Sequence, residues 1–91
     1  MITIRSFARL KEIFGEERQC PFSEQSTVAD ALLLLIHETQ VPPSTIFNDM
    51  GDVHAHFIVM LNKKRLTQAA IMEQVLSDGD EIILYPPVSG G

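Results

Sequence analysis

The chain of 91 residues is long enough for one domain with a modest hydrophobic core and too short for two. A hydrophobic fraction of 45% and a charged fraction of 21% are typical of a folded globular protein and argue against intrinsic disorder. The net charge of −5 argues against a nucleic-acid partner, because an acidic surface repels phosphates.

Two further features of the sequence bear on membrane and redox roles. The longest apolar run, residues 31–36, is far shorter than the roughly 20 residues that a membrane span needs, and no basic segment followed by an apolar run begins the chain. We therefore expect a cytoplasmic protein with no membrane partner. The single cysteine, Cys20, leaves no internal disulfide and no CxxC pair for zinc, and we expect it to be a small buried apolar residue.

The beginning of the chain predicts two strands around a short helix. Apolar residues alternate with polar ones over residues 2–7, which indicates a strand whose last side chain, Phe7, turns inward. A helix is expected over residues 8–14, ended by Gly15, which accepts a left-handed conformation. Residues 18–22 predict a second strand, which a proline without an N–H donor places at a sheet edge. The apolar residues of the helix follow the spacing i, i+3, i+4 and are Leu10, Ile13 and Phe14.

The clearest helix begins at Ser26 or Thr27 and runs to about Thr39, before a pair of prolines. Either residue can cap the helix, and Asp30 follows Thr27 at the spacing of a capping box. We expect this helix to pack tightly against a sheet. Its inward stripe is predicted to comprise Val28, Leu32, Leu35 and Ile36, broadened by Leu33 and Leu34.

The second half of the chain is predicted from its turn formers and apolar runs. Residues 42–53 are rich in turn formers and indicate an exposed loop around one apolar anchor, Ile46-Phe47. The nearly continuous apolar run of residues 55–61 predicts a strand inside the sheet. Beyond it we expect, in order, a turn at Asn62-Lys63, a short strand over residues 64–67, one or two helical turns within 68–77, a tight turn at 77–80 and a last strand over 81–85.

This order of elements, ββαβββ, indicates an α+β fold of the β-grasp, or ubiquitin-like, type. The first and last strands would pair in parallel in the middle of a mixed five-stranded sheet, with the main helix across one face. We therefore divide the chain into a β-grasp domain, residues 1–85, and an extended, flexible C-terminal tail, residues 86–91.

The tail, Pro86-Pro87-Val88-Ser89-Gly90-Gly91, has the composition of a segment that inserts into another protein. Prolines end a sheet ladder and stiffen the chain that follows it. Gly90 and Gly91 have no Cβ, so this end could pass through a narrow channel and present the Gly91 α-carboxylate inside a partner. A frayed terminus without function is the alternative interpretation.

Several segments together resemble the small sulfur-carrier subunit of molybdopterin synthase, a ubiquitin-like family. The most specific is Leu76-Ser77-Asp78-Gly79-Asp80-Glu81-Ile82 followed by the terminal hexapeptide. Residues 7–15, residues 26–32 and Asn62 after an apolar strand also match, so the resemblance spans the chain. Lys63 departs from the glycine that often follows this asparagine, which puts the geometry of that turn in question.

The resemblance implies a non-catalytic sulfur carrier that binds no cofactor of its own. An E1-like adenylating enzyme would use ATP to convert the Gly91 carboxylate to an acyl adenylate, and a sulfur donor protein would then leave a thiocarboxylate. The tail would enter the large catalytic subunit of molybdopterin synthase, where Gly91 gives its sulfur for molybdenum-cofactor biosynthesis. Apolar residues on the sheet face away from the helix, with Phe57 and Tyr85 as candidates, would hold these partners, although both could instead belong to the core.

Other functions share parts of this pattern. A ubiquitin-like modifier would use the same activation and then join Gly91 to lysines of other proteins through an isopeptide bond. A sulfur carrier for thiamine synthesis or tRNA thiolation would share the thiocarboxylate. A binding module with an inert tail would differ from all of these, because it would lose nothing when Gly91 is deleted.

The remaining polar residues carry weaker functional hypotheses. His54 and His56 would point the same way on the predicted strand, but no third ligand is evident and we expect no metal site. His37 has no nucleophile at a suitable spacing, and Ser89 has no base. The basic run of residues 63–65 is too short for a nucleic-acid site and indicates a solvated turn.

Overall fold

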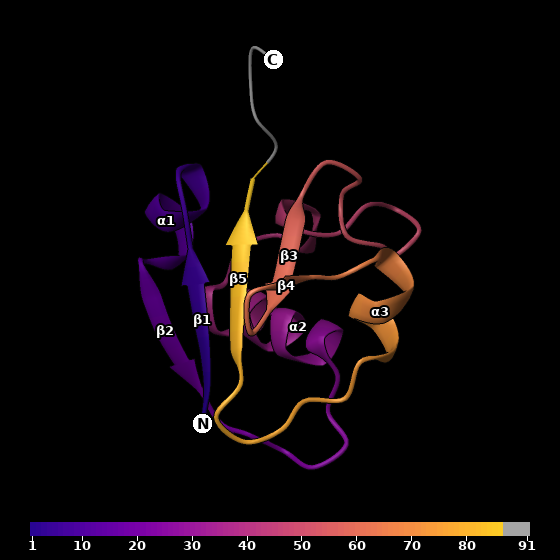
Figure 1. Cartoon of the computed structure of the whole chain (residues 1–91). Helices are drawn as coiled ribbons and strands as arrows, with labels where there is room; N and C mark the ends of the chain where they lie inside the picture. Colours follow the sequence, from indigo (N-terminus) through magenta and orange to yellow (C-terminus); the bar gives the residue numbers. More distant parts are fainter. Residues whose placement is uncertain (87–91) are drawn as a thin grey trace.

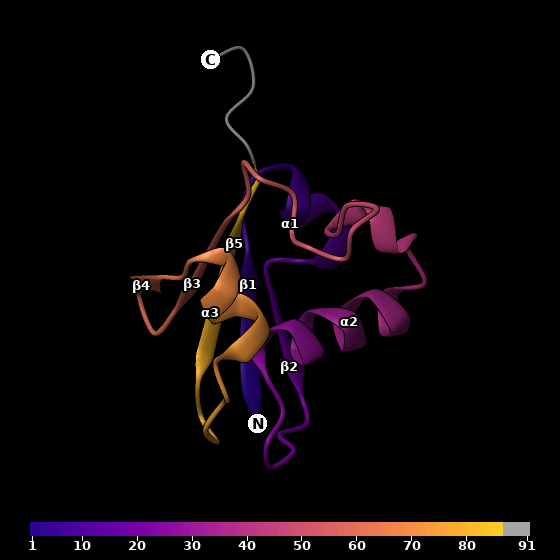
Figure 2. The ribbon, with the colours of Figure 1, turned by 90° about the vertical axis from the view of Figure 1, so that its right-hand side faces the viewer.

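The computed structural model describes residues 1–86 of the chain. The elements form one five-stranded sheet in the order β2-β1-β5-β3-β4, and α2 lies across one of its faces (Figures 1 and 2). The α+β, β-grasp architecture predicted from the sequence is therefore confirmed. In chain order the elements are β1 (Ile2–Ser6), α1 (Arg9–Phe14), β2 (Glu17–Cys20), α2 (Val28–Thr39), the 3₁₀ helix η1 (Pro43–Thr45), β3 (Ile58–Leu61), β4 (Lys64–Arg65), α3 (Gln68–Glu73) and β5 (Glu81–Tyr85).

The centre of the sheet is the parallel pair of β1 and β5, as predicted, while the other neighbouring strands run antiparallel. Ile4 lies opposite Ile82 in this pair, and Ser6 lies opposite Leu84. These alternate residues point toward α2 and are buried. The first and last strands thus supply the middle of the core.

The main helix begins as the sequence predicts. The Thr27 side chain accepts a hydrogen bond from the Asp30 N–H at 3.2 Å, and the Asp30 carboxylate accepts one from the Thr27 N–H at 2.9 Å. This reciprocal pair satisfies two N–H groups that would otherwise lack partners at the helix start. The expected inward stripe is buried, but Leu33 is 50% exposed. Its assignment to the stripe was wrong, because a turn of about 100° per residue carries Leu33 away from Leu32 and off the sheet.

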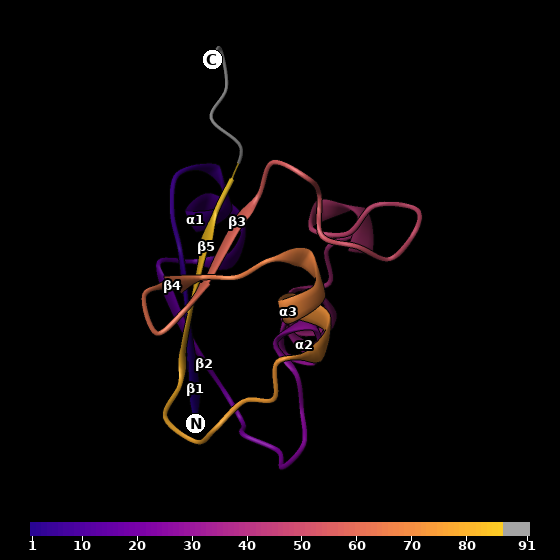
Figure 3. The ribbon, with the colours of Figure 1, turned by 45° about the vertical axis from the view of Figure 1, so that its right-hand side comes forward.

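The start of α2 is also fastened to the segment that follows α3. Val28 donates its N–H to the Gln74 carbonyl at 3.1 Å, and Leu76 donates its N–H to the Ser26 carbonyl at 2.8 Å. Between these bonds, Thr27 and Val75 form an antiparallel bridge. The helical turns expected within residues 68–77 are present as α3, which lies beside α2 (Figure 3).

Three predicted elements are shorter or less buried than expected. The strand predicted over residues 64–67 comprises only Lys64–Arg65. The strand predicted over residues 55–61 begins only at Ile58, because residues 54–57 form a turn in which Phe57 donates its N–H to the His54 carbonyl. Ile13 of α1 is exposed, since a helix of six residues buries only Leu10 and Phe14. The strand β2 does lie at the sheet edge, and the anchor of the long loop, Ile46-Phe47, is buried as predicted. No helix within residues 1–86 has the length and hydrophobicity to cross a membrane.

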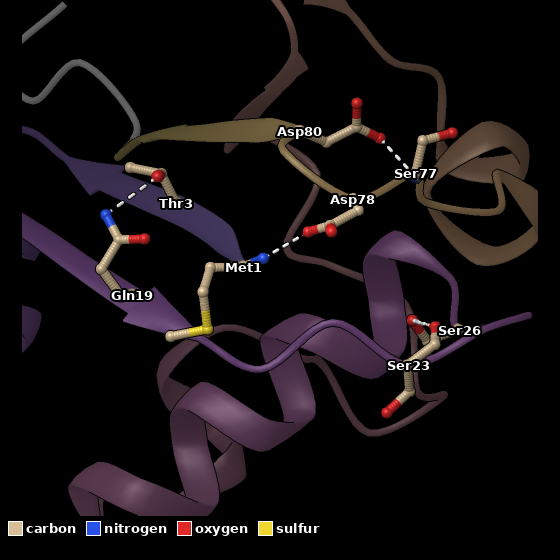
Figure 4. A network of polar contacts seen from close by, with 8 residues as sticks. All are labelled: Met1, Thr3, Gln19, Ser23, Ser26, Ser77, Asp78 and Asp80. Carbon is tan, nitrogen blue, oxygen red and sulfur yellow. Dashed lines mark hydrogen bonds and ion pairs between the residues drawn. The ribbon is translucent and has the colours of Figure 1, made fainter.

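The tight turn at residues 77–80 closes the end of the sheet where the chain begins (Figure 4). The Met1 ammonium pairs with the Asp78 carboxylate, and this hydrogen bond lowers the pKa of Asp78. Asp80 accepts a hydrogen bond from the Ser77 N–H at 2.7 Å and another from the Asn62 side-chain amide at 2.9 Å. The turn is therefore tied to both the N-terminus and the β3–β4 hairpin.

The β3–β4 hairpin turns through two residues with positive φ, Asn62 at 50° and Lys63 at 72°. Positive φ at both central residues is typical of a type I′ turn, which matches the twist of the flanking strands. Asn tolerates this conformation, and its side chain also accepts a hydrogen bond from the Glu81 N–H at 2.9 Å. Lys63 neither favours positive φ nor gains such a hydrogen bond, so its backbone is strained in this turn.

We expect Lys63→Gly to raise the free energy of unfolding by about 0.5 to 1 kcal/mol, because relief of left-handed strain exceeds the extra unfolded-state entropy of glycine. Urea denaturation measures the difference. Lys64→Gly is the matched control, since it removes the same charge from a residue with ordinary strand geometry and is expected to destabilise. A lower stability for Lys63→Gly would contradict the strain assigned to this turn.

Candidate functional site

The tail leaves the sheet from its central strand. β5 ends at Tyr85 and passes directly into Pro86, with Phe7 after β1 on one side and Ile58 at the start of β3 on the other. Tyr85 and Pro86 are half-buried. The rest of the predicted tail lies outside the described residues, so the roles assigned to it stay predictions. These residues are Pro87, Val88, Ser89, Gly90 and Gly91.

An apolar patch lies on the open face of the sheet, the face away from α2, at the end where the tail leaves. The register places Ile58 beside Tyr85 and Met60 beside Ile83, and alternation along β5 turns Tyr85 and Ile83 away from the core residues Ile82 and Leu84. We call this set, together with Phe7, the open-face patch. Its members are Phe7, Ile58, Met60, Ile83 and Tyr85.

Phe7 and Tyr85 form the part of the patch nearest the tail. Their rings stack with centroids 4.6 Å apart and planes 11° apart, and Phe7 donates its N–H to the Leu84 carbonyl at 3.2 Å. The expectation that Phe7 turns inward was wrong. Ser6 is the last inward residue of β1, so the next side chain falls on the open face, where it is 39% exposed.

The turn after Phe7 holds that ring in place at the expense of backbone strain. Ala8 has φ 54° and ψ −130°, and Leu10 donates its N–H to the Phe7 carbonyl at 3.1 Å. These values fit the first central position of a type II′ turn, where glycine is the usual residue. Strain of this kind is common beside functional sites.

The other half of the open face is charged. Arg5 donates from Nε to Glu81 at 2.6 Å and pairs through a second nitrogen with Glu17 at 2.8 Å. The hydrogen bond to Glu81, assisted by the charge of Glu17, raises the pKa of Arg5. Thr3 accepts a further hydrogen bond from the Gln19 amide on the same face at 3.0 Å. The open face is thus charged and polar over β1, β2 and the start of β5, and apolar over β3 and the end of β5.

The two residues proposed from the sequence as partner contacts lie in different places. Tyr85 lies in the open-face patch, whereas Phe57 is partly buried against the core and meets the His54 ring at 5.5 Å. Because Phe57 directly precedes Ile58, alternation turns the two side chains to opposite faces. Phe57 therefore does not join Tyr85, and the role of Tyr85 as a contact stays a prediction.

The histidines singled out in the sequence are not brought together with other ligands in the part of the chain that the structure describes. His54 and His56 precede β3 instead of lying on it, and the His54 ring contacts the Ser44 carbonyl at 2.7 Å. No three His, Cys, Asp or Glu side chains of residues 1–86 gather as metal ligands. Cys20 is buried as predicted, and burial raises the pKa of its thiol.

Four members of the open-face patch, Phe7, Ile58, Met60 and Ile83, were not predicted from the sequence. Phe7 was assigned to the core, and Ile58 and Met60 were merged into an apolar run. Alternation about the buried Val59 was the available signal, since it turns both neighbours to the open face. Apolar residues on both faces of an internal strand indicate either a strand covered on both sides or, as here, a partly exposed patch.

The fold and the site define a ubiquitin-like protein whose last strand leads out of the sheet beside a partly exposed apolar patch. The chain belongs to the ThiS family, which it matches over residues 4–91. Small archaeal modifier protein 1 of Haloferax volcanii is 35% identical over 86 residues, covering 93% of this chain and 94% of the relative. Small archaeal modifier protein 3 of the same organism is 30% identical over 91 residues, covering 99% and 98%.

Solved structures agree with this assignment. The crystal structure of SAMP1 from Haloferax volcanii superposes with a TM-score of 0.85 at 31% identity and covers 99% of this chain and 98% of that one. Urm1 from Trypanosoma brucei, at 19% identity and a TM-score of 0.79, covers 99% and 94% and shows the fold alone.

The stack of Phe7 on Tyr85 predicts a measurable coupling between the two side chains. In a double-mutant cycle of Phe7→Ala and Tyr85→Ala, we expect a coupling free energy of about 0.5 to 1.5 kcal/mol, the range for aromatic pairs. Urea denaturation of the four proteins gives this value. Ile13→Ala combined with Tyr85→Ala is the control and should show no coupling. A Phe7–Tyr85 coupling within error of zero would contradict the stack.

Proposed function

We propose that this protein is a carrier whose Gly91 α-carboxylate is activated with ATP by an E1-like adenylating enzyme. The family match, which runs through residue 91, is the observation that carries this proposal. The direct passage of β5 into Pro86 supports it, because a central strand gives the segment beyond it a fixed point of departure. The open-face patch beside that point offers a surface by which the enzyme could hold the body.

The chemistry needs little from the carrier itself. A carboxylate oxygen is a poor leaving group, so the Gly91 carboxylate would first attack the α-phosphorus of ATP and release pyrophosphate. The resulting acyl adenylate exposes its carbonyl to a nucleophile, with AMP as the leaving group. The activating enzyme would supply the catalytic side chains, and this protein would be its substrate.

One candidate fate of the adenylate is attachment to other proteins. Both relatives named above, which this chain matches over almost their whole length, are named modifier proteins, which favours this fate. The amine of a lysine on a target would then attack the activated carbonyl, directly or after transfer to an enzyme thiol, and form an isopeptide bond to Gly91.

The second candidate fate is sulfur transfer. The turn Ser77-Asp78-Gly79-Asp80 joined to the terminal hexapeptide resembles the small subunit of molybdopterin synthase, which favours this fate. A sulfur donor protein would displace AMP and leave a thiocarboxylate on Gly91. The tail would then enter a large catalytic subunit, which passes the sulfur to a pterin precursor. Thiamine synthesis and tRNA thiolation would use the same intermediate.

The activation step predicts a change of mass at the C-terminus. After incubation with ATP, a cognate activating enzyme and a sulfur donor, we expect the intact mass to rise by the exchange of one oxygen for sulfur. Deletion of Gly91 serves as the control and should remove the product without lowering thermal stability. In cells, lysine-linked adducts that end in Gly91 would support the modifier fate, and their absence together with a thiocarboxylate would support sulfur transfer. If neither product were found, the proposed activation would be contradicted.

The open-face patch predicts the effect of a charge beside the tail. Tyr85→Glu is expected to weaken binding to the activating enzyme by about tenfold or more, because a charge in the middle of an apolar contact must be desolvated. Leu33→Glu, an equally drastic change on the exposed back of α2, is the matched control and should leave binding unchanged. Calorimetric titration measures both. Loss of folding of Tyr85→Glu, with unchanged affinity of the fraction that stays folded, would assign Tyr85 to the core.

A further inference from the structure

One row of side chains crosses the whole open face at the level of Ile83. In the register, Met60 lies opposite Ile83 on one side and opposite Arg65 of β4 on the other. Arg5 lies opposite both Ile83 and Glu17. Directly paired residues of neighbouring strands point to the same face of a sheet, so Arg65 lies on the open face next to Met60. The open-face patch therefore has an arginine on each flank.

The two arginines differ in how far their guanidinium groups are already bonded. Arg5 donates to Glu81 at 2.6 Å and pairs with Glu17 at 2.8 Å. Arg65 is exposed, and its guanidinium takes part in none of the side-chain hydrogen bonds or ion pairs within residues 1–86. An arginine side chain carries five N–H donors and is always charged. These donors are available to a partner on the β4 flank of the patch, whereas on the β1 flank they are largely used.

The acids nearest to this hairpin do not compensate the charge of Arg65. Glu81 lies two strands and two residues away in the register, a separation of about 12 Å, and its carboxylate is bonded to Arg5. Asp80 is one residue further away and accepts a hydrogen bond from the Asn62 amide at 2.9 Å. Exposed charges more than about 8 Å apart are largely screened at physiological ionic strength. The β4 flank of the patch is therefore locally positive.

We infer that Arg65 orients the activating enzyme on the open-face patch by pairing with a carboxylate of that enzyme. This inference rests on the proposed function, because it names how the enzyme recognises the body of the carrier. A stable interface covers about 800 Å² of each partner, so an enzyme centred on the partly exposed patch also covers its flanks. The planar fork of arginine suits bidentate pairing with a carboxylate, and apolar contacts beside the pair exclude water from it.

The pair would supply a direction that the apolar contacts lack. Burial of apolar surface is non-directional, so the patch alone allows the enzyme to rotate about it. Arg65 lies on one flank only, two strands from β5, and a carboxylate opposite it selects one orientation. Since the tail departs from β5, this orientation also sets where the tail enters the enzyme.

The inference is tested by ATP–pyrophosphate exchange on the cognate activating enzyme, with the concentration of the carrier varied. Arg65→Gln is expected to raise the KM for the carrier about tenfold and to leave kcat unchanged, because the pair stabilises the bound state and the transition state equally. Arg65→Lys keeps the charge and loses the fork, so its KM should fall between; it also provides a reading if Arg65→Gln unfolds. Lys64→Gln is the matched control. It removes the same charge from the next residue, whose side chain alternation turns to the other face, and should leave the KM unchanged.

Two further measurements separate recognition from folding. The KM of the unaltered carrier should rise more steeply with salt than the KM of Arg65→Gln, whereas the two proteins should melt at the same temperature. Carbodiimide coupling of the Arg65→Lys variant to the enzyme should join the amine at position 65 to an Asp or Glu of the enzyme, and mass spectrometry of the digested product identifies the amide.

The outcomes distinguish this inference from the proposed function. Exchange with an equal KM for the unaltered carrier and Arg65→Gln would overturn the inference alone, as would a higher KM that is explained by a lower melting temperature. Absence of exchange with the unaltered carrier would contradict the proposed function, and the inference with it.

Discussion

The parallel pairing of β1 with β5 is the interaction on which the rest of the structure depends. It brings the two ends of the described chain to the middle of the sheet, so that Ile4 and Ile82 form one layer under α2. Because the two strands run the same way, the N-terminus and the exit of the tail lie at opposite ends of the sheet (Figure 1). One end is closed by the contacts of Met1 with the turn at residues 77–80, and the other is left for partners.

The chemical character of the open face follows from this arrangement. On the β1–β2 side of this face, level with Ile83, Arg5 bridges two glutamates and leaves little uncompensated charge. Where the tail leaves the sheet, Phe7 and Tyr85 expose aromatic surface, which does not contribute to the stability of the free domain. The turn that positions Phe7 contains Ala8 at positive φ, and this backbone strain lowers the stability of the folded state at this end of the molecule. Binding of partners beside the tail is a physical reason for that cost.

The features that were predictable from the sequence are those set by local chemistry. The capping box of Thr27 and Asp30, the turn around Gly79 and the alternation along β1 need only short-range hydrogen bonds and a period of two or 3.6. Side chains at the ends of elements were not predictable in this way. Phe7 and Leu33 were predicted to point toward the core because they are apolar. The alternation along β1 and the helical turn of α2 instead direct both side chains outward. The position of Phe57 depends on where β3 begins, which a tertiary turn decides.

The bonds between the start of α2 and the segment after α3 have a consequence for how the protein folds. The Val28 N–H has its hydrogen-bond partner in Gln74, and β1 pairs with β5. Both the helix and the sheet therefore need contacts between residues that are far apart in the sequence. High contact order of this kind slows folding, because the entropy of loop closure is lost before the long-range contacts lower the free energy. During synthesis no large part of the core can form until Tyr85 has left the ribosome. The domain should therefore fold in a single late step, and a native body would guarantee that the last strand, and the point from which the tail departs, is already in place.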